Sequence, residues 1–206
     1  MTEHKKKILI LFAHPSPSRS EANLPLFKSS RGLPGVTVVD LYHEYPTLHI
    51  NIDREQKRLL DHDVIVFMFP MYWYSTPAIL KEWQDLVLEY GFAYGKDGTA
   101  LNGKTFLCAL TAGGTQAAYH ADGHNNYTVR ELLHPIEQTA NLIGMHYLAP
   151  FVLFDSRTAK EQKRVEQHTK DWRQLLDALR DDRVEMNAAS HVDVLNADLT
   201  AVIKEG

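Results

Sequence analysis

The 206-residue chain has little cysteine, no excess of positive charge and no long apolar run. Its single cysteine, Cys108, excludes an internal disulfide, and its apolar surroundings favour a small buried hydrophobic residue over a nucleophile. A net charge of −4 gives no electrostatic basis for binding nucleic acid. No apolar run approaches the length of a membrane span, and the run after basic residues 5–7 is too short for a signal peptide. We therefore expect a cytoplasmic protein.

Two common phosphate-binding motifs are either missing or out of context. No G-x-G-x-x-G occurs, so the dinucleotide-binding fingerprint is absent. Residues 98–105 match the P-loop pattern G-x-x-x-x-G-K-[ST], but a P-loop needs a strand before it and a helix after it. Here a glycine-rich turn comes first and a strand-like run follows. We interpret the match as a turn that leads into a strand.

Strand-like and helix-like runs alternate along the chain. The predicted strands are residues 8–13, 36–40, 64–69, 105–111 and 145–154, the last interrupted by Pro150. The predicted helices are residues 22–30, 53–61 with Asp53 as N-cap, 77–90, 128–144 and 159–179. This alternation predicts an α/β fold, a doubly wound five-stranded parallel sheet with helices on both faces.

The C-terminal residues 184–206 differ from the rest because they show no clear period. We therefore separate them as a tail from a domain at residues 1–183. We expect this tail to pack on a partner subunit or to fray.

The loop after the first predicted strand has the character of an anion site. It contains His14, Arg19, the three serines of residues 16–20, and Asn23. A buried strand that feeds a polar loop and then a helix N-terminus directs free backbone N–H groups toward a ligand. We predict that Ser18, Ser20 and Asn23 donate to phosphate oxygens and that Arg19 or His14 offsets the charge. A simpler alternative is that Ser20 only caps the helix.

The loop after the third predicted strand is rich in aromatic residues. Tyr72, Trp73 and Tyr74 lie between Pro70 and Pro77. A stiff loop with flat apolar surfaces suits a planar heterocycle, and ligands of doubly wound sheets bind at this end of the strands. The alternatives are a hydrophobic plug or a subunit interface.

The loop after the fourth predicted strand begins Thr111-Ala-Gly-Gly114. Adjacent glycines allow the backbone to approach a ligand closely, although Gly-Gly is also common in ordinary turns. Further along, His120 and His124 have a spacing that binds metals on helices. Gly123 and the lack of an apolar period argue against a helix, and no third ligand is evident, so we predict no metal site.

With these loops in place, the chain resembles the flavodoxin-like NAD(P)H:quinone oxidoreductases. It is most similar to the bacterial subgroup that serves as ancillary subunits of the glutathione-gated Kef potassium-efflux systems. The resemblance covers residues 8–180. It rests on the order and spacing of segments 12–15, 20–23, 40–42, 45–46, 53–56, 70–75, 80–83, 91–95, 98–104 and 111–114.

The resemblance implies a flavin cofactor, FMN or in some relatives FAD, and assigns roles by position. The residues implied to hold the flavin phosphate are His14, Ser20, Glu21, Ala22 and Asn23. Those implied to edge the isoalloxazine ring are Met71, Tyr72, Trp73 and Tyr74. Those implied to close over its pyrimidine side are Thr111, Ala112, Gly113 and Gly114, where Ala112 replaces a commoner threonine and is expected to contribute its N–H. The residues implied to assist hydride transfer are Tyr119 and His124.

The implied reaction is a ping-pong cycle in which NAD(P)H reduces the flavin and a quinone then takes the hydride. Amides of Gly113 and Gly114 are expected to stabilise the reduced ring, and His124 to serve the quinone oxygen. Relatives dimerise, so residues 91–98 and the tail are candidate subunit contacts. One alternative is a regulatory subunit of a Kef-type transporter, held peripherally at the inner membrane. Another is an electron-transfer flavodoxin, which is usually shorter and more acidic.

Overall fold

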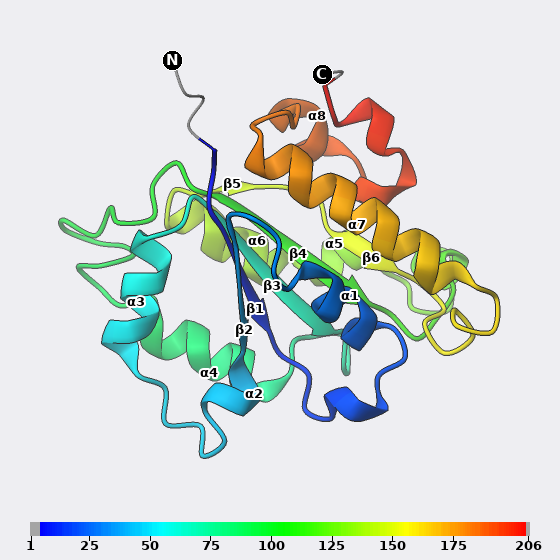
Figure 1. The fold of residues 1–206 in the computed structure, drawn as a ribbon, viewed down its shortest axis with the longest axis horizontal. Coiled ribbons are helices and arrows are strands. Elements are labelled where there is room, and N and C mark those ends of the chain that lie inside the picture. The colour runs from blue at the N-terminus through cyan, green and yellow to red at the C-terminus, as the bar shows by residue number, and fades with distance from the viewer. Residues whose placement is uncertain (1–4, 205–206) are drawn as a thin grey trace.

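The computed structural model describes residues 5–204, in which six strands form one sheet (Figure 1). The strand order is β2 (Val36–Asp40), β1 (Ile8–Phe12), β3 (Val64–Pro70), β4 (Thr105–Thr111) and β5 (His146–Tyr147), and β6 (Phe151–Leu153) also pairs with β4. Every pair is parallel. The strand order reverses between β1 and β3, which confirms the predicted doubly wound α/β fold. The outermost residues of the predicted domain and tail, 1–4 and 205–206, lie outside the described residues.

The predicted fifth strand is two strands, β5 and β6, because it contains a bulge. Thr105 and Phe106 pair with His146 and Tyr147, whereas Ala109 pairs with Phe151. Three residues, 148–150, therefore lie opposite two residues of β4. Pro150 has no N–H to donate, which favours the interruption at this point.

The sheet is buried on both faces, as the unbroken apolar run of β1 predicted. Leu9 and Leu11 belong to one hydrophobic core, and Ile8, Ile10 and Phe12 belong to a second core on the other face. The helices of the first core are α2 (Leu41–Glu44), α3 (Ile52–Leu60), α4 (Ala78–Val87), α5 (Val129–Leu132) and α6 (His134–Leu142). Those of the second core are α1 (Asn23–Ser30), α7 (Arg164–Arg180) and α8 (Met186–His191).

Several predicted helix boundaries were wrong. The N-cap of α3 is Asn51, whose Oδ1 accepts from Arg54 N–H at 2.9 Å, and not Asp53. The predicted helix 128–144 is two helices, because Pro135 begins a new first turn at α6. Residues 155–163 form a loop before α7, and the predicted helix 77–90 is confined to α4.

The carboxylate of Glu55 holds α3 and α4 together and so supports the aromatic loop that precedes α4. Glu55 is fully buried, and it accepts from Tyr45 OH at 2.6 Å and Trp83 Nε1 at 2.9 Å. It also forms an ion pair with Arg58. A short helix, α2 (Leu41–Glu44), leads into Tyr45, so this one carboxylate connects three helical segments.

The C-terminal residues 184–204 pack on their own chain. Val184 forms a bridge with Ile203, and Ala189, Leu195 and Val202 are buried in the second core. Arg130 donates to the carbonyl oxygens of Ser190 at 2.6 Å and Val192 at 2.7 Å. The described part of the tail is therefore ordered against the domain, and its contact with a partner subunit stays a prediction.

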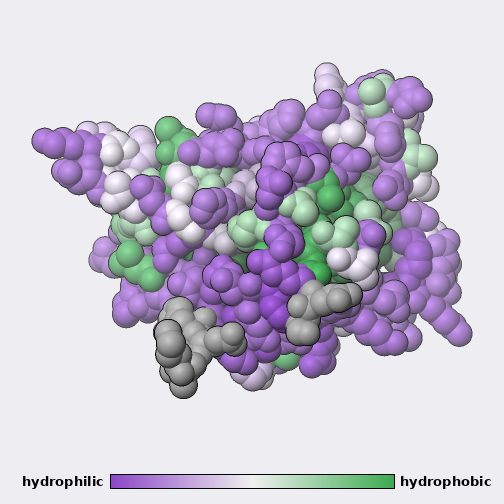
Figure 2. Space-filling view, turned by 90° about the horizontal axis from the view of Figure 1, so that it is seen from above, coloured by the Kyte–Doolittle hydropathy of each residue, from purple (hydrophilic) through white to green (hydrophobic). Residues whose placement is uncertain are grey.

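The surface seen in Figure 2 is mostly hydrophilic, with apolar residues in smaller patches between charged ones. No helix within residues 5–204 is both long enough and apolar enough to cross a bilayer.

His168 on α7 is a titratable residue in an apolar environment. Its side chain is buried, its ring centroid lies 4.4 Å from that of Phe151, and its Nε2 has no hydrogen-bond partner. Burial, and after it the charge of Arg164, lowers the pKa of His168 to about 4. Between pH 6.5 and pH 4 the unfolded chain thus binds a proton at this histidine that the folded chain does not bind.

We predict that His168 makes the fold sensitive to mild acid. Lowering the pH from 7 to 5 should reduce the free energy of unfolding by about 2 kcal/mol through this residue alone. Urea unfolding at pH 7 and at pH 5 measures this effect. The decrease in the free energy of unfolding between the two pH values should be about 2 kcal/mol smaller for His168→Leu than for the wild type. His49→Leu, at an exposed loop position, is the control and should behave like the wild type. Equal losses in His168→Leu and the wild type would contradict the prediction.

Candidate functional site

The loops that follow β1, β3, β4 and β6 meet at the carboxyl edge of the sheet (Figure 1) and enclose two adjoining pockets. The serine-loop pocket, of about 320 Å³, is lined by His14, Arg19, Ser20, Glu21, Ala22, Asn23, Pro70, Met71, Tyr72, Thr111, Gly113, Ser156 and Arg157. The aromatic pocket, of about 770 Å³, is lined by Met71, Tyr72, Trp73, Tyr74, Gly113, Gly114, Ala118, Tyr119, His124, Asn125 and Arg157. Four lining residues are common to both pockets, so together they form one cleft at the switch point of the sheet.

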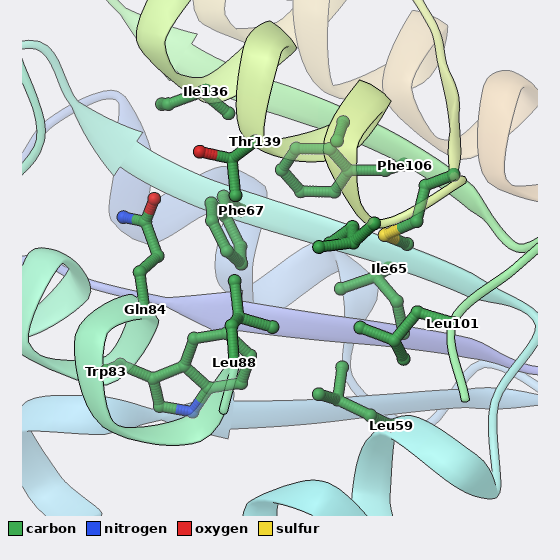
Figure 3. A pocket seen from close by; sticks show the side chains of 13 residues that line it. Leu59, Ile65, Phe67, Trp83, Gln84, Leu88, Leu101, Phe106, Ile136 and Thr139 are labelled. Carbon is green, nitrogen blue, oxygen red and sulfur yellow. The ribbon is translucent and has the colours of Figure 1, made fainter. Parts of the chain in front are cut away.

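A third cavity lies between α4 and α6 and is unsuited to a cofactor. Figure 3 shows Phe67, Trp83 and Phe106 among the side chains around it. Its volume is only about 20 Å³ and its walls are almost entirely apolar. A space of this size holds at most about one water molecule, so it is a packing gap of the first core.

The serine loop exposes the N-terminus of α1. The N-cap of α1 is Ala22 and not Ser20, although Ser20 Oγ accepts from the N–H of Asn23, the first residue of the helix, at 2.9 Å. The N–H groups of residues 21, 22 and 24 have no protein acceptor within residues 5–204. This end of α1 thus keeps free donors for an anion. Ser16 and Ser18 line neither pocket.

The burial of His14 favours the neutral form of its ring in the absence of a bound anion. Burial lowers its pKa below the usual value of 6.5, so the ring is neutral at pH 7. Its Nδ1 accepts from Ser16 N–H at 3.1 Å, which leaves the proton on Nε2. Arg19 is therefore favoured over His14 as the cation that offsets the charge of a bound anion, and this role stays a prediction.

Asn23 connects the serine loop to the end of β4. Its Nδ2 donates to Thr111 Oγ1 at 2.7 Å, and both side chains are buried. Asn23 Oδ1 has no hydrogen-bond partner. The amide can donate to the threonine hydroxyl or accept from it, and in either orientation one amide atom remains for a ligand in the serine-loop pocket.

The aromatic loop contains a strained two-residue turn. Tyr72 and Ser75 exchange two backbone hydrogen bonds of 3.0 Å, while Trp73 and Tyr74 adopt φ values of 49° and 63°. Such left-handed conformations cost about 1–3 kcal/mol each and are often found at functional sites. Tyr74 OH donates to Asn125 Oδ1 at 3.2 Å, so the tyrosine spans the aromatic pocket. Trp73 lies at the rim of the pocket, with 95% of its surface exposed.

Ala112, like Ser18, is a predicted cofactor residue that the structure does not bring into the cleft. Ala112 is fully buried and lines neither pocket. Its N–H donates to Leu153 O at 2.9 Å, so the N–H expected to serve the ligand is already used. The N–H of Gly113, by contrast, has no protein acceptor in the part of the chain that the structure describes.

Tyr119 and His124 both line the aromatic pocket. Tyr119 is buried beside Phe154, and burial, with the neighbouring Tyr74, raises the pKa of its hydroxyl, so it stays protonated. His124 is exposed and lies in a non-helical turn, as predicted. Gly123 is required there because a Cβ would come within 2.5 Å of Ala117 O.

The P-loop match lies outside the cleft. Residues 100–103 form a turn that leads through Lys104 into β4, which confirms the interpretation as a turn before a strand. Lys104 donates to the carbonyl oxygens of His62 at 2.5 Å and Leu60 at 3.3 Å. Its ammonium group therefore fastens a loop and does not face a ligand.

Ser156 and Arg157 of the loop after β6, together with Ala118 and Asn125, line the cleft but were not predicted from the sequence. Only the loops after the first, third and fourth predicted strands, with Tyr119 and His124, were predicted to form the site. The signal was available, because the last strand is parallel to the others and its carboxyl end must lie at the same edge.

We predict that Asn23 and Thr111 stabilise the protein as a pair. Asn23→Ala and Thr111→Val should each lower the free energy of unfolding by about 1–2 kcal/mol, because the shared hydrogen bond is lost. The free energy of unfolding that the double variant loses should be about 1 kcal/mol smaller than the sum of the losses in the two single variants, since the hydrogen bond is lost only once. Urea unfolding of the four proteins measures this coupling. Fully additive costs would show that the hydrogen bond contributes nothing.

Comparison with known proteins gives one family match and close relatives. Residues 6–176 match a family described by its flavodoxin-like fold. The glutathione-regulated potassium-efflux system ancillary protein KefG of Cronobacter sakazakii is 47% identical over 157 residues, which are 76% of this chain and 85% of that protein.

Two solved structures extend the comparison. General stress protein 14 of Treponema denticola, in complex with FMN, has a TM-score of 0.79 and 39% identity, covering 84% of this chain and 99% of that one. An NADPH-quinone reductase from P. pentosaceus has a TM-score of 0.69 and 32% identity, covering 80% of this chain and 96% of that one.

Proposed function

Because this chain belongs to the family with the flavodoxin-like fold, which its residues 6–176 match, we propose that it is an FMN-dependent NAD(P)H:quinone oxidoreductase. The observation that carries the proposal is the continuous cleft at the switch point, where an anion-binding loop adjoins an aromatic pocket. Similarity to an FMN complex and to an NADPH-quinone reductase supports the same cofactor and reaction for this chain.

The residues of the cleft fit the parts of FMN. The phosphate suits the free N–H groups at the start of α1, the Nε2–H of His14 and the guanidinium of Arg19. The unpartnered amide atom of Asn23 suits either a phosphate oxygen or a hydroxyl of the ribityl chain. The aromatic pocket, with a volume of about 770 Å³ and with Met71, Tyr72, Trp73 and Tyr74 in its lining, offers the space and the flat aromatic surfaces that suit a planar ring.

When bound, FMN supplies hydride transfer, first from NAD(P)H and then to a quinone that enters after NAD(P)⁺ has left. Tyr119, protonated at neutral pH, offers an O–H donor from the floor of the aromatic pocket. We assign to His124, exposed on the pocket wall, the proton or hydrogen bond that the quinone oxygen receives. Trp73 and Tyr74 exclude water from the reacting edge when a substrate covers them.

We also propose that the protein is a homodimer. Trp73 at the rim of the cleft is 95% exposed, and Tyr90 and Tyr94 are 65% and 38% exposed. The rings of Tyr90 and Tyr94 form an edge-to-face pair with centroids 5.8 Å apart. Exposed aromatic side chains of this kind are enriched in protein interfaces.

A second role is supported by the similarity to KefG, whose name describes an ancillary protein of a potassium-efflux system. In that role the chain binds a Kef-type transporter at the inner membrane, and its enzymatic activity is secondary. The fold and the cleft are compatible with both roles, because a flavin site serves catalysis and sensing equally well.

The enzyme proposal predicts a yellow protein that releases FMN on heating and oxidises NADPH or NADH with menadione. His124→Gln should slow oxidation of the reduced enzyme by menadione about 100-fold, because the quinone oxygen loses its proton donor. The rate at which NAD(P)H reduces this variant should change little. Stopped-flow measurement of the two half-reactions separates these effects.

His120→Gln is the matched control for this experiment. His120 is also exposed but lines a different, smaller cavity of about 30 Å³, so both half-reactions should keep the wild-type rates. A colourless protein that cannot be reconstituted with flavin would overturn the enzyme proposal. Equal effects of the two substitutions would overturn the role given to His124.

The transporter role predicts that the tagged protein co-purifies with a Kef-type transporter expressed in the same cells. Potassium efflux through that transporter should fall when the gene for this chain is deleted and recover when it is restored. Efflux that is independent of the chain would exclude this second role and leave the enzyme proposal intact.

A further inference from the structure

Arg157, in the loop between β6 and α7, lies where the two pockets join. Its side chain lines both the serine-loop pocket and the aromatic pocket. It also lies against Gly113, because a Cβ built on that glycine would be 3.6 Å from Arg157 Nε and 3.9 Å from Nη2. The guanidinium is therefore next to the part of the β4 loop that borders both pockets.

The charge of Arg157 is not neutralised by the protein. Within residues 5–204 its guanidinium takes part in no ion pair and no side-chain hydrogen bond, whereas the nearby carboxylates are engaged elsewhere. Asp155 lies 3.6 Å from Arg164 and accepts from Thr158 Oγ1 at 2.8 Å. Glu21 is paired with Lys160 at 2.6 Å. An exposed guanidinium without a carboxylate partner keeps its charge for a ligand that enters the cleft.

We propose that Arg157 sets the electron affinity of the bound flavin by stabilising the negative charge that the ring gains on reduction. This inference rests on the proposed function. Hydride transfer from NAD(P)H moves two electrons and one proton to the ring and releases NAD(P)⁺, so the ring gains one negative charge. A fixed cation near that charge favours the reduced cofactor over the oxidised one.

Two features favour the ring over the phosphate as the partner of Arg157. The phosphate end of the cleft already has a cation in Arg19, together with the free N–H groups of α1. Arg157, in contrast, adjoins Gly113, whose unpartnered N–H is a second donor at the junction with the aromatic pocket. The two donors lie close enough to act on the same developing charge.

The experiment compares the affinities of the oxidised and reduced cofactor in variants of the whole protein. Apoprotein is titrated with FMN to obtain the dissociation constant of the oxidised form. Equilibration of the complex with a reference dye then gives the ratio of the dissociation constants of oxidised and reduced FMN. Arg157→Gln should weaken binding of reduced FMN about tenfold more than binding of oxidised FMN. Arg157→Lys, which keeps the charge, should restore most of the difference.

Two further arginine variants are the controls. Arg19→Gln removes the same charge from the phosphate end and should weaken both forms of FMN equally. Arg173→Gln removes an exposed charge on α7 and should change neither. If Arg157→Gln weakens both forms equally, or neither, the inference is overturned while the proposed function stands. If the wild-type protein binds no FMN, the proposed function itself fails, and the inference fails with it.

Discussion

The site depends on one constraint, which is that every strand of the sheet runs in the same direction. The carboxyl ends of β1, β3, β4 and β6 therefore lie at one edge, and the loops after them are forced together. The hydrogen bond from Asn23 to Thr111 fixes this arrangement, because it joins loops from two strands that are separated by β3. On the first-core side of the sheet, Glu55 holds the helix that follows the aromatic loop. The cleft is thus a product of the topology, secured by a few buried polar contacts.

Much of this arrangement could be predicted from the sequence, because apolar runs mark buried strands and the residues that stop them mark loops. The positions of the first four strands along the chain, the serine loop and the aromatic loop followed from such patterns. The hydrogen-bond partners of individual groups could not be predicted from these patterns. Nothing near Ala112 indicates that its N–H is used by Leu153, and nothing near His14 indicates that Ser16 fixes its tautomer. Arg157 was not predicted because only the loops after the first, third and fourth strands were considered, although the loop between the last predicted strand and the last predicted helix ends at the same edge of the sheet.

The cleft carries positive charge, although the net charge of the whole chain is negative. The protein carries a net charge of −4, yet Arg19 and Arg157 line the cleft and the Glu21 carboxylate at its edge is paired with Lys160. His14, held neutral by burial, adds a donor without adding charge. A local positive potential within an acidic surface attracts a small anion into the cleft, and the rest of the surface repels polyanions.

The exposure of Trp73 has a spectroscopic consequence. The chain has three tryptophans, of which Trp83 and Trp172 are almost completely buried in the two cores, whereas Trp73 is 95% exposed at the rim of the cleft. As long as no partner subunit covers Trp73, emission at the red edge of the intrinsic fluorescence is expected from this residue, and quenching by a small solute such as acrylamide should select it over the other two. The protein carries an internal optical reporter of its own site, one that follows occupancy of the cleft without a label.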